Sequence, residues 1–212
     1  MLTTSFWLCG VVEKLFDDGW RHPHKKPNPK IFFMFEVVWS LTLHTSFVSY
    51  LERIEQKGKF TVRQQIKGNQ AYGWHGTRRR CMIGDDLNKL NQFCADSACA
   101  TCVILTKSFD ANYAGKAPGR AFLRFGRAIY TSTVSSKADD YQNSPGSQYK
   151  SLILARVVKG TPDTRKVGDK KLVAPNAGFD CVEGQVGQEL NYDECCFYHN
   201  DAVRPAFLIL YK

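Results

Sequence analysis

Short runs of apolar, aromatic and β-branched residues recur along this chain of 212 residues, and turn-forming stretches separate most of them. Such runs predict strands, and they occur at Lys30–Val38, Gln70–Thr77, Ala128–Thr131, Lys150–Lys159, Tyr192–Tyr198 and Ala206–Tyr211. Helices are predicted at Val11–Arg21, Ser40–Lys57 and Ser135–Tyr141, with a partly helical stretch at Arg78–Leu90. Loops are predicted at Gly115–Gly119 and across Gly160–Gly187. Because strands and helices do not alternate in β-α-β order, we expect an α+β fold with a mainly antiparallel sheet.

Length and charge limit the classes of protein to which the chain can belong. Its size fits one domain over residues 28–212, preceded by a helix and a basic, proline-rich loop over residues 1–27. A formal net charge of +9 favours negatively charged partners such as nucleic acid or phosphate-bearing ligands, although a merely soluble basic protein has the same composition. No apolar window approaches the ~18 residues that span a membrane, and the start has no basic region typical of a secretory signal. We therefore expect an intracellular protein, cytoplasmic or nuclear, with no membrane partner.

Three separate stretches place polar or aromatic residues at the ends of predicted strands. The first is Tyr-Gly-Trp-His-Gly-Thr-Arg-Arg-Arg, residues 72–80. The second is Phe-Gly-Arg-Ala-Ile-Tyr, residues 125–130, followed by the predicted helix at Ser135–Tyr141. The third is Tyr-Asp-Glu, residues 192–194, ahead of the last apolar run. In chain order they present a His, a Tyr and a Glu. Each residue alone is more often a packed or solvated side chain, so the ordered set carries the signal.

Together these stretches resemble the catalytic domain of the poly(ADP-ribose) polymerase family, the diphtheria-toxin-like ADP-ribosyltransferases. That family shows a His-Gly-Thr strand, a Gly-x-x-Ile-Tyr strand followed by Ser-Lys-x-x-x-Tyr, and a late Glu before a closing strand pair. The corresponding residues here are His75–Thr77, Gly126–Tyr130, Ser136–Tyr141 and Glu194. The resemblance covers about residue 28 to the end. It implies a split, mainly antiparallel β-sheet with a few flanking helices, and NAD as the donor substrate.

The resemblance also implies a reaction and the residues that perform it. An ADP-ribosyltransferase breaks the bond between nicotinamide and ribose, and a carboxylate stabilises the cation-like sugar of the transition state. The implied catalytic residues are Glu194, His75 and Tyr130. The implied NAD-binding residues are His75, Gly76, Thr77, Tyr130, Ser136 and Tyr141. Size and the short acceptor region favour transfer of a single ADP-ribose to a protein, with release of nicotinamide.

One position departs from the family pattern and leaves alternatives open. Where the family usually has a serine that helps hold the nicotinamide amide, this chain has Ala138. Loss of one such hydrogen bond weakens NAD binding by roughly 0.5–1.5 kcal/mol. A catalytically weak module that binds NAD or ADP-ribose is therefore one alternative. ADP-ribosylation of nucleic acid, suggested by the basic charge, is another.

Cysteines and arginines between the His and Tyr motifs suggest further sites. Cys99 and Cys102 form a C-x-x-C pair, and Cys81 and Cys94 lie upstream, so four thiolates could bind a structural zinc. The spacing is irregular for known zinc fingers, and free thiols or disulfides remain alternatives. Cys195 and Cys196 should point to opposite faces of a strand. Arg78, Arg79 and Arg80 could meet the NAD pyrophosphate or an acidic acceptor, although a solvated face has the same pattern.

Overall fold

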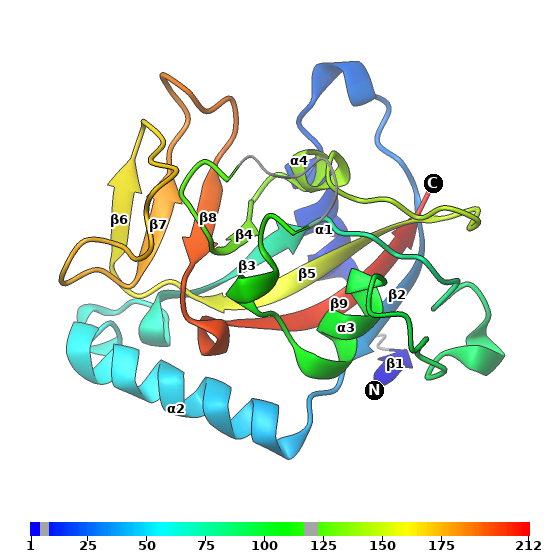
Figure 1. Cartoon of the computed structure of the whole chain (residues 1–212), viewed down its shortest axis with the longest axis horizontal. Coiled ribbons are helices and arrows are strands. Elements are labelled where there is room, and N and C mark those ends of the chain that lie inside the picture. The colour runs from blue at the N-terminus through cyan, green and yellow to red at the C-terminus, as the bar shows by residue number, and fades with distance from the viewer. Residues whose placement is uncertain (5–8, 117–122) are drawn as a thin grey trace.

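The computed structural model describes residues 1–4, 9–116 and 123–212 (Figure 1). A five-stranded sheet runs in the order β1-β2-β9-β5-β3, and each neighbouring pair in it is antiparallel. Its strands are β1 (Leu2–Thr4), β2 (Ile31–Val37), β3 (Gln70–His75), β5 (Lys150–Val158) and β9 (Val203–Tyr211).

A second sheet has four strands in the order β4-β8-β7-β6. They are β4 (Ile129–Thr131), β6 (Pro162–Arg165), β7 (Cys181–Gly184) and β8 (Glu194–Phe197). The β6–β7 pair is parallel, and the other pairs are antiparallel. A bridge between Trp74 and Ser132 joins the two sheets, so β4 lies between β3 and β8 (Figure 1).

Four α-helices are found among the described residues: α1 (Cys9–Gly19), α2 (Leu41–Gly58), α3 (Ala100–Lys107) and α4 (Ser135–Asp139). Short 3-10 turns occur at Pro23–Lys25, Thr61–Arg63, Lys67–Asn69, Leu87–Lys89, Ala111–Tyr113 and Asn200–Ala202. The Ser40 hydroxyl accepts a hydrogen bond from Leu43 N, which caps α2 where the sequence predicted its start.

Both faces of the five-stranded sheet are covered by buried side chains. The alternating side chains of β5 belong to a different cluster on each face. Ile153, Ala155 and Val157 share a buried cluster with residues of α2 and α3. Leu152 and Leu154 point the other way, into a cluster that contains Phe16 and Trp20 from α1 and the turn after it. A third cluster lies under the smaller sheet and contains Phe125, Ala128, Val182, Leu190 and Cys196. β5 is therefore apolar on both sides, as its continuous run of apolar residues requires.

The α+β class with mainly antiparallel pairing is confirmed, as are the strands and helices predicted from the longest apolar runs. Two expectations were wrong. The stretch expected to be loop-rich contains β6 and β7, and the partly helical stretch after residue 78 contains only the 3-10 turn at Leu87–Lys89. The loop expected at Gly115–Gly119 falls partly outside the described residues. Within the described part of the chain, no helix combines the length and the apolar character that crossing a bilayer requires.

Candidate functional site

The three residues singled out by the motifs come from neighbouring strands at the junction of the sheets. His75 ends β3, Tyr130 is the middle residue of β4, and Glu194 begins β8. Trp74 forms a bridge with Ser132, the residue just after β4, and Thr131 faces Cys195 on β8. His75 and Glu194 each lie one residue from these pairs, so the fold brings the three motifs close together. Among the described residues, no hydrogen bond or ion pair joins His75 directly to Glu194.

The His75 ring is held by a backbone carbonyl and an aromatic edge. Its Nδ1 lies 2.9 Å from Tyr130 O, and the ring packs edge to face on Phe109 with 5.1 Å between centroids. A carbonyl can only accept, so Nδ1 carries the proton and Nε2 is an acceptor in the neutral ring. Burial lowers the pKa of His75 below its usual value, and the bond to Tyr130 O only partly offsets this. At neutral pH the ring is therefore uncharged and offers one acceptor nitrogen.

Gly76 is required by the close approach of α4. A Cβ at this position would lie 1.8 Å from Ala138 O and 3.1 Å from Gln142 N, and both are backbone atoms. Beyond it, Thr77 O accepts a hydrogen bond from Asn143 N at 3.3 Å. The His-Gly-Thr turn is therefore packed directly against the end of α4 and the residues that follow it.

The Tyr130 hydroxyl is used to hold a turn. It donates to Gly126 O at 2.7 Å and accepts from Phe125 N at 2.9 Å. Gly126 has a φ of +69°, and a Cβ there would meet Leu172 O at 1.8 Å, so the motif glycine is needed on both counts. Burial raises the pKa of the Tyr130 phenol well above its usual value. The hydroxyl is protonated and already makes two hydrogen bonds within the protein. The half-buried ring of Tyr130 is therefore the part of the side chain that can contact a ligand.

Glu194 is a largely buried carboxylate whose two oxygens have different surroundings. Oε1 lies 2.8 Å from Lys137 Nζ. Oε2 lies 3.9 Å from Arg124 Nε, is inaccessible to solvent, and accepts no hydrogen bond from the described residues. Buried polar atoms are nearly always hydrogen-bonded. Oε2 is therefore a buried acceptor of this site that has no donor among the described residues.

Tyr130 and Glu194 share a face of the smaller sheet. Tyr130 pairs with Cys196, and Glu194 lies two residues before Cys196 on the same strand. Side chains two residues apart on a strand point the same way, so the phenol ring and the carboxylate lie on one side. Cys195 lies in the cluster with α2, and Cys196 lies in the cluster under the smaller sheet, which confirms that these two cysteines face opposite ways.

Helix α4 connects most of the remaining motif residues. Lys137 Nζ bonds Glu194 and also donates to the carbonyl oxygens of Tyr192 and Asp193, each at 3.1 Å. Lys137 belongs to the Ser-Lys-x-x-x-Tyr motif, but the sequence assigned no role to this lysine. Ser136 is fully buried and hydrogen-bonded to the segment that follows α1. Tyr141, two residues beyond the helix, is 46% exposed, so its ring remains accessible from solvent.

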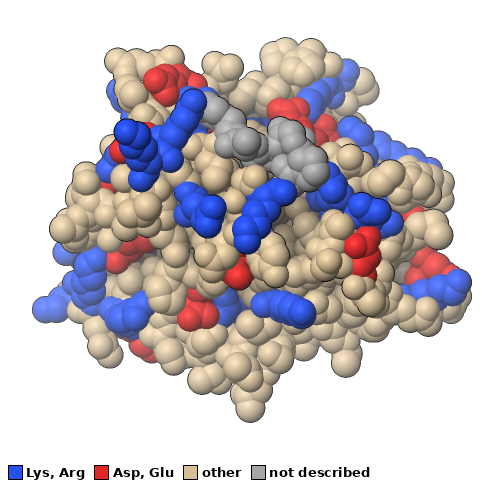
Figure 2. Space-filling model, in the orientation of Figure 1, with Lys and Arg blue, Asp and Glu red and all other residues tan. Residues whose placement is uncertain are grey.

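Two of the three consecutive arginines after the His-Gly-Thr turn, Arg79 and Arg80, have different surroundings. Arg79 is completely buried, pairs with Asp85 at 2.6 Å, and donates to Tyr149 O at 2.7 Å. It is a structural residue, so the expectation that it meets a pyrophosphate or solvent is wrong. Arg80 is exposed and pairs with Asp96 at 2.9 Å. On the face shown in Figure 2, basic and acidic side chains are interspersed rather than gathered into one basic surface.

The four cysteines of the insert, all between positions 81 and 102, converge in the fold although their spacing is irregular. The Sγ atoms of Cys81, Cys94, Cys99 and Cys102 all lie within 4.8 Å of one another and could hold a metal ion. Cys81 Sγ lies 3.7 Å from Cys99 Sγ and 3.4 Å from Cys102 Sγ. These distances are far longer than the ~2.05 Å of a disulfide. A hydrogen bond from Cys102 is the main cause that lowers the pKa of Cys99.

No known protein-family model matches this sequence, and comparison with curated proteins finds no significant similarity. The function is therefore inferred from the geometry of the site and from the resemblance of its motifs.

Proposed function

We propose that this protein transfers ADP-ribose from NAD to a protein acceptor and releases nicotinamide. The observation that carries this proposal is the environment of Glu194. Its carboxylate is fixed by Lys137, shares a face with the Tyr130 ring, and has one buried oxygen that receives no hydrogen bond from the described part of the chain. A fixed carboxylate with a vacant acceptor position suits a sugar hydroxyl next to a developing positive charge.

In the proposed reaction the bond between the ribose C1′ and the nicotinamide nitrogen breaks. The bonding electrons leave with nicotinamide, which departs as a neutral molecule, and positive charge develops on the sugar. Glu194 Oε2 accepts a hydrogen bond from a ribose hydroxyl, and the negative carboxylate stabilises that charge. An acceptor oxygen or nitrogen then bonds to C1′ and loses its proton to Glu194 or to solvent.

The other motif residues bind and orient the donor. The neutral His75 ring offers Nε2 as an acceptor for a hydroxyl of the adenosine ribose. Gly76 and Thr77 supply backbone groups beside it. The rings of Tyr130 and Tyr141 are suited to flank the flat, positively charged nicotinamide.

A second candidate function is binding of NAD or ADP-ribose without efficient transfer. It is favoured by Ala138, which has no hydroxyl, together with the bonding of the neighbouring serines. Ser135 donates to Phe16 O at 2.7 Å, and Ser136 accepts from Arg21 N at 2.9 Å. Neither hydroxyl is free to replace the missing one, so NAD affinity should be modest.

Incubation with NAD labelled in the adenosine half tests both functions at once. Transfer predicts labelled protein and one nicotinamide released for each label. Binding alone predicts saturable NAD binding with neither product. A parallel incubation with RNA or DNA ends as the sole acceptor tests the remaining alternative, ADP-ribosylation of nucleic acid, because label would then appear on the nucleic acid. No binding and no product would contradict the proposed function.

We also propose that the four-cysteine cluster holds a zinc ion. A tetrahedral Zn²⁺ with four Zn–S bonds of about 2.3 Å has S···S edges of about 3.8 Å. The distances from Cys81 Sγ to Cys99 Sγ and Cys102 Sγ lie near this value, at 3.7 and 3.4 Å. Cys99 and Cys102 lie at the start of α3, and Cys81 lies just after the His-Gly-Thr turn, so this ion would tie the two segments together. A hydrogen bond from Thr101 N to Arg78 O at 3.0 Å already joins them. The role of the ion is structural.

Replacing both Cys99 and Cys102 with serine is expected to reduce bound zinc from about one ion per chain to well below one, and to lower the melting temperature. Elemental analysis of protein purified under reducing conditions measures the metal. Cys181→Ala is the matched control, because Cys181 is also buried but lies outside the cluster. A well-folded, zinc-free natural sequence would contradict this site.

A further inference from the structure

The segment before β2 is built into the site although it lies outside the part of the chain that carries the motifs. Residues 9–26, here called the N-terminal segment, comprise α1 and the turn after it. The Ser135 hydroxyl donates to Phe16 O at 2.7 Å. A Cβ on Gly19 would lie 2.8 Å from Ser135 N, so this glycine allows α1 to reach the start of α4.

His22 binds α4 through the hydroxyl of Ser136. That oxygen accepts from Arg21 N at 2.9 Å and from His22 N at 3.1 Å, and it lies 2.7 Å from His22 Nδ1. The two backbone donors use both lone pairs of the hydroxyl, and its proton has two acceptors within reach, Nδ1 at 2.7 Å and Gly19 O at 3.4 Å. Nδ1 is much the nearer of the two and accepts it. His22 is then neutral, in agreement with the burial that lowers its pKa. Lys25 Nζ adds a bond to Ser136 O at 2.9 Å.

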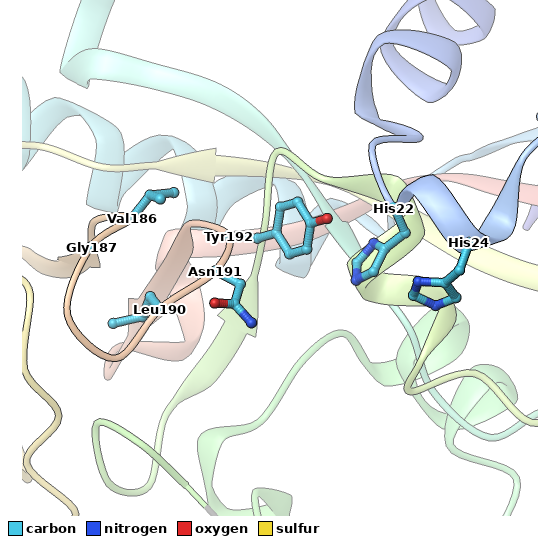
Figure 3. A pocket seen from close by; sticks show the side chains of 7 residues that line it. All are labelled: His22, His24, Val186, Gly187, Leu190, Asn191 and Tyr192. Atoms are coloured by element: carbon cyan, nitrogen blue, oxygen red, sulfur yellow. The ribbon is translucent and has the colours of Figure 1, made fainter.

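The other side of the His22 ring packs on the chain just before Glu194. The rings of His22 and Tyr192 lie 4.2 Å apart between centroids, at an interplanar angle of 38°. Figure 3 shows both side chains, with His24 beside them, lining an open cavity of about 580 Å³. His24 is exposed, and its ring packs edge to face on His22 with 5.3 Å between centroids.

His22 therefore contacts the same two segments that the Lys137–Glu194 ion pair joins. Ser136 immediately precedes Lys137 on α4. Tyr192 lies two residues before Glu194, and its carbonyl accepts from Lys137 Nζ at 3.1 Å. The ion pair connects α4 to the start of β8 through the Lys137 side chain, and His22 connects them a second time through Ser136 and Tyr192.

We propose that His22 is a positioning residue that fixes Lys137, and through it the carboxylate of Glu194, for ADP-ribosyl transfer. This role rests on the proposed function. His22 does not itself touch the reacting atoms. With His22 truncated, α4 and the Tyr192–Glu194 segment keep the contacts of Lys137 with Glu194 and with the carbonyl oxygens of Tyr192 and Asp193. They lose the His22 ring that packs between Ser136 and Tyr192, so the carboxylate samples a wider range of positions. Catalysis is sensitive to such displacement, because a shift of about 1 Å at a reacting group costs up to about 100-fold in rate.

Hydrogen exchange tests the geometry independently of any activity. In His22→Ala we expect amide exchange to quicken by about tenfold in both the α4 segment and residues 192–197, with β5 and β9 unchanged. His24→Ala, from the same loop and the same cavity wall, is the matched control and should exchange like the natural sequence. Unchanged exchange in His22→Ala would overturn the proposal, and so would faster exchange spread evenly over the whole chain.

Kinetics then test the link to catalysis. His22→Ala should lower kcat by about 10- to 100-fold while KM for NAD changes little. His22→Asn should recover part of the rate, because its side-chain oxygen can accept the Ser136 proton. In a Lys137→Ala background the His22→Ala change should have little further effect, since both act through Glu194. Additive losses, or a raised KM with unchanged kcat, would overturn the role. Absence of transfer in the natural sequence would contradict the proposed function, while the exchange result would still decide the geometry.

Discussion

Replacing Glu194 with glutamine is expected to abolish ADP-ribosyl transfer while NAD binding survives. Glutamine keeps the shape of the side chain but loses the negative charge that would stabilise the cation-like sugar. The expected loss in kcat is about 10²- to 10⁴-fold, in line with removal of an acid–base or charge-stabilising group. Transfer of labelled ADP-ribose measures the rate, and calorimetric titration with NAD measures the affinity.

Glu189→Gln is the matched control for this change. Glu189 is five positions earlier in the chain, is more exposed, and also lies near Arg124, with 3.0 Å between the charged atoms. Its replacement removes a neighbouring carboxylate without altering the buried one, so transfer should remain close to that of the natural sequence. Equal losses in the two variants would indicate a general electrostatic effect, and unchanged transfer in Glu194→Gln would remove Glu194 from the reaction.

Gly76→Ala is expected to damage both stability and NAD binding. The new methyl group would lie 1.8 Å from Ala138 O, a backbone atom that cannot rotate away, so α4 must move. Overpacking of this kind typically costs about 1–3 kcal/mol of folding free energy. Movement of α4 also displaces Lys137 and the chain leading to Tyr141. Denaturant unfolding measures the stability, and NAD titration measures the loss at the site.

Gly10→Ala is the control for replacing a glycine by alanine. Gly10 lies in α1, and a Cβ there would have no atom of the described residues within 4 Å. Alanine should stabilise the helix by about 0.5–1 kcal/mol and leave NAD binding unchanged. If Gly76→Ala behaved like Gly10→Ala, the close packing of α4 against the His-Gly-Thr turn would be wrong.

Local sequence pattern was enough for the elements that bury a long apolar face. The helix beginning after Ser40 and the strand β5 were predicted nearly to the residue, because capping and continuous apolar runs act within one segment. The strand β6, with the sequence Pro-Asp-Thr-Arg, has no such pattern. It is a strand because β7 pairs with it, which is a tertiary effect that no local rule contains.

In the candidate site, too, local sequence predicted some features and tertiary contacts determined the others. The motifs put His75 and Glu194 at strand ends, as the structure has them, while Tyr130 is the middle residue of β4. The fold brings the three to one junction. Their partners were not predictable, since the Lys137–Glu194 contact and the His22–Ser136 contact span 57 and 114 positions. The four cysteines were named from the sequence, but their irregular spacing could not show that their sulfur atoms converge. Arg79 looked like a surface charge because sequence alone does not reveal that its side chain is buried and paired with the partly exposed Asp85.

A crystal structure with bound NAD tests the assignment of the site most directly. We expect the nicotinamide ring to lie between Tyr130 and Tyr141, with a ribose hydroxyl within hydrogen-bonding distance of Glu194 Oε2. His75 Nε2 should accept a hydrogen bond from the adenosine ribose. NAD bound away from the junction of the two sheets, or bound there with Glu194 Oε2 still lacking a hydrogen bond, would contradict this reading of the site.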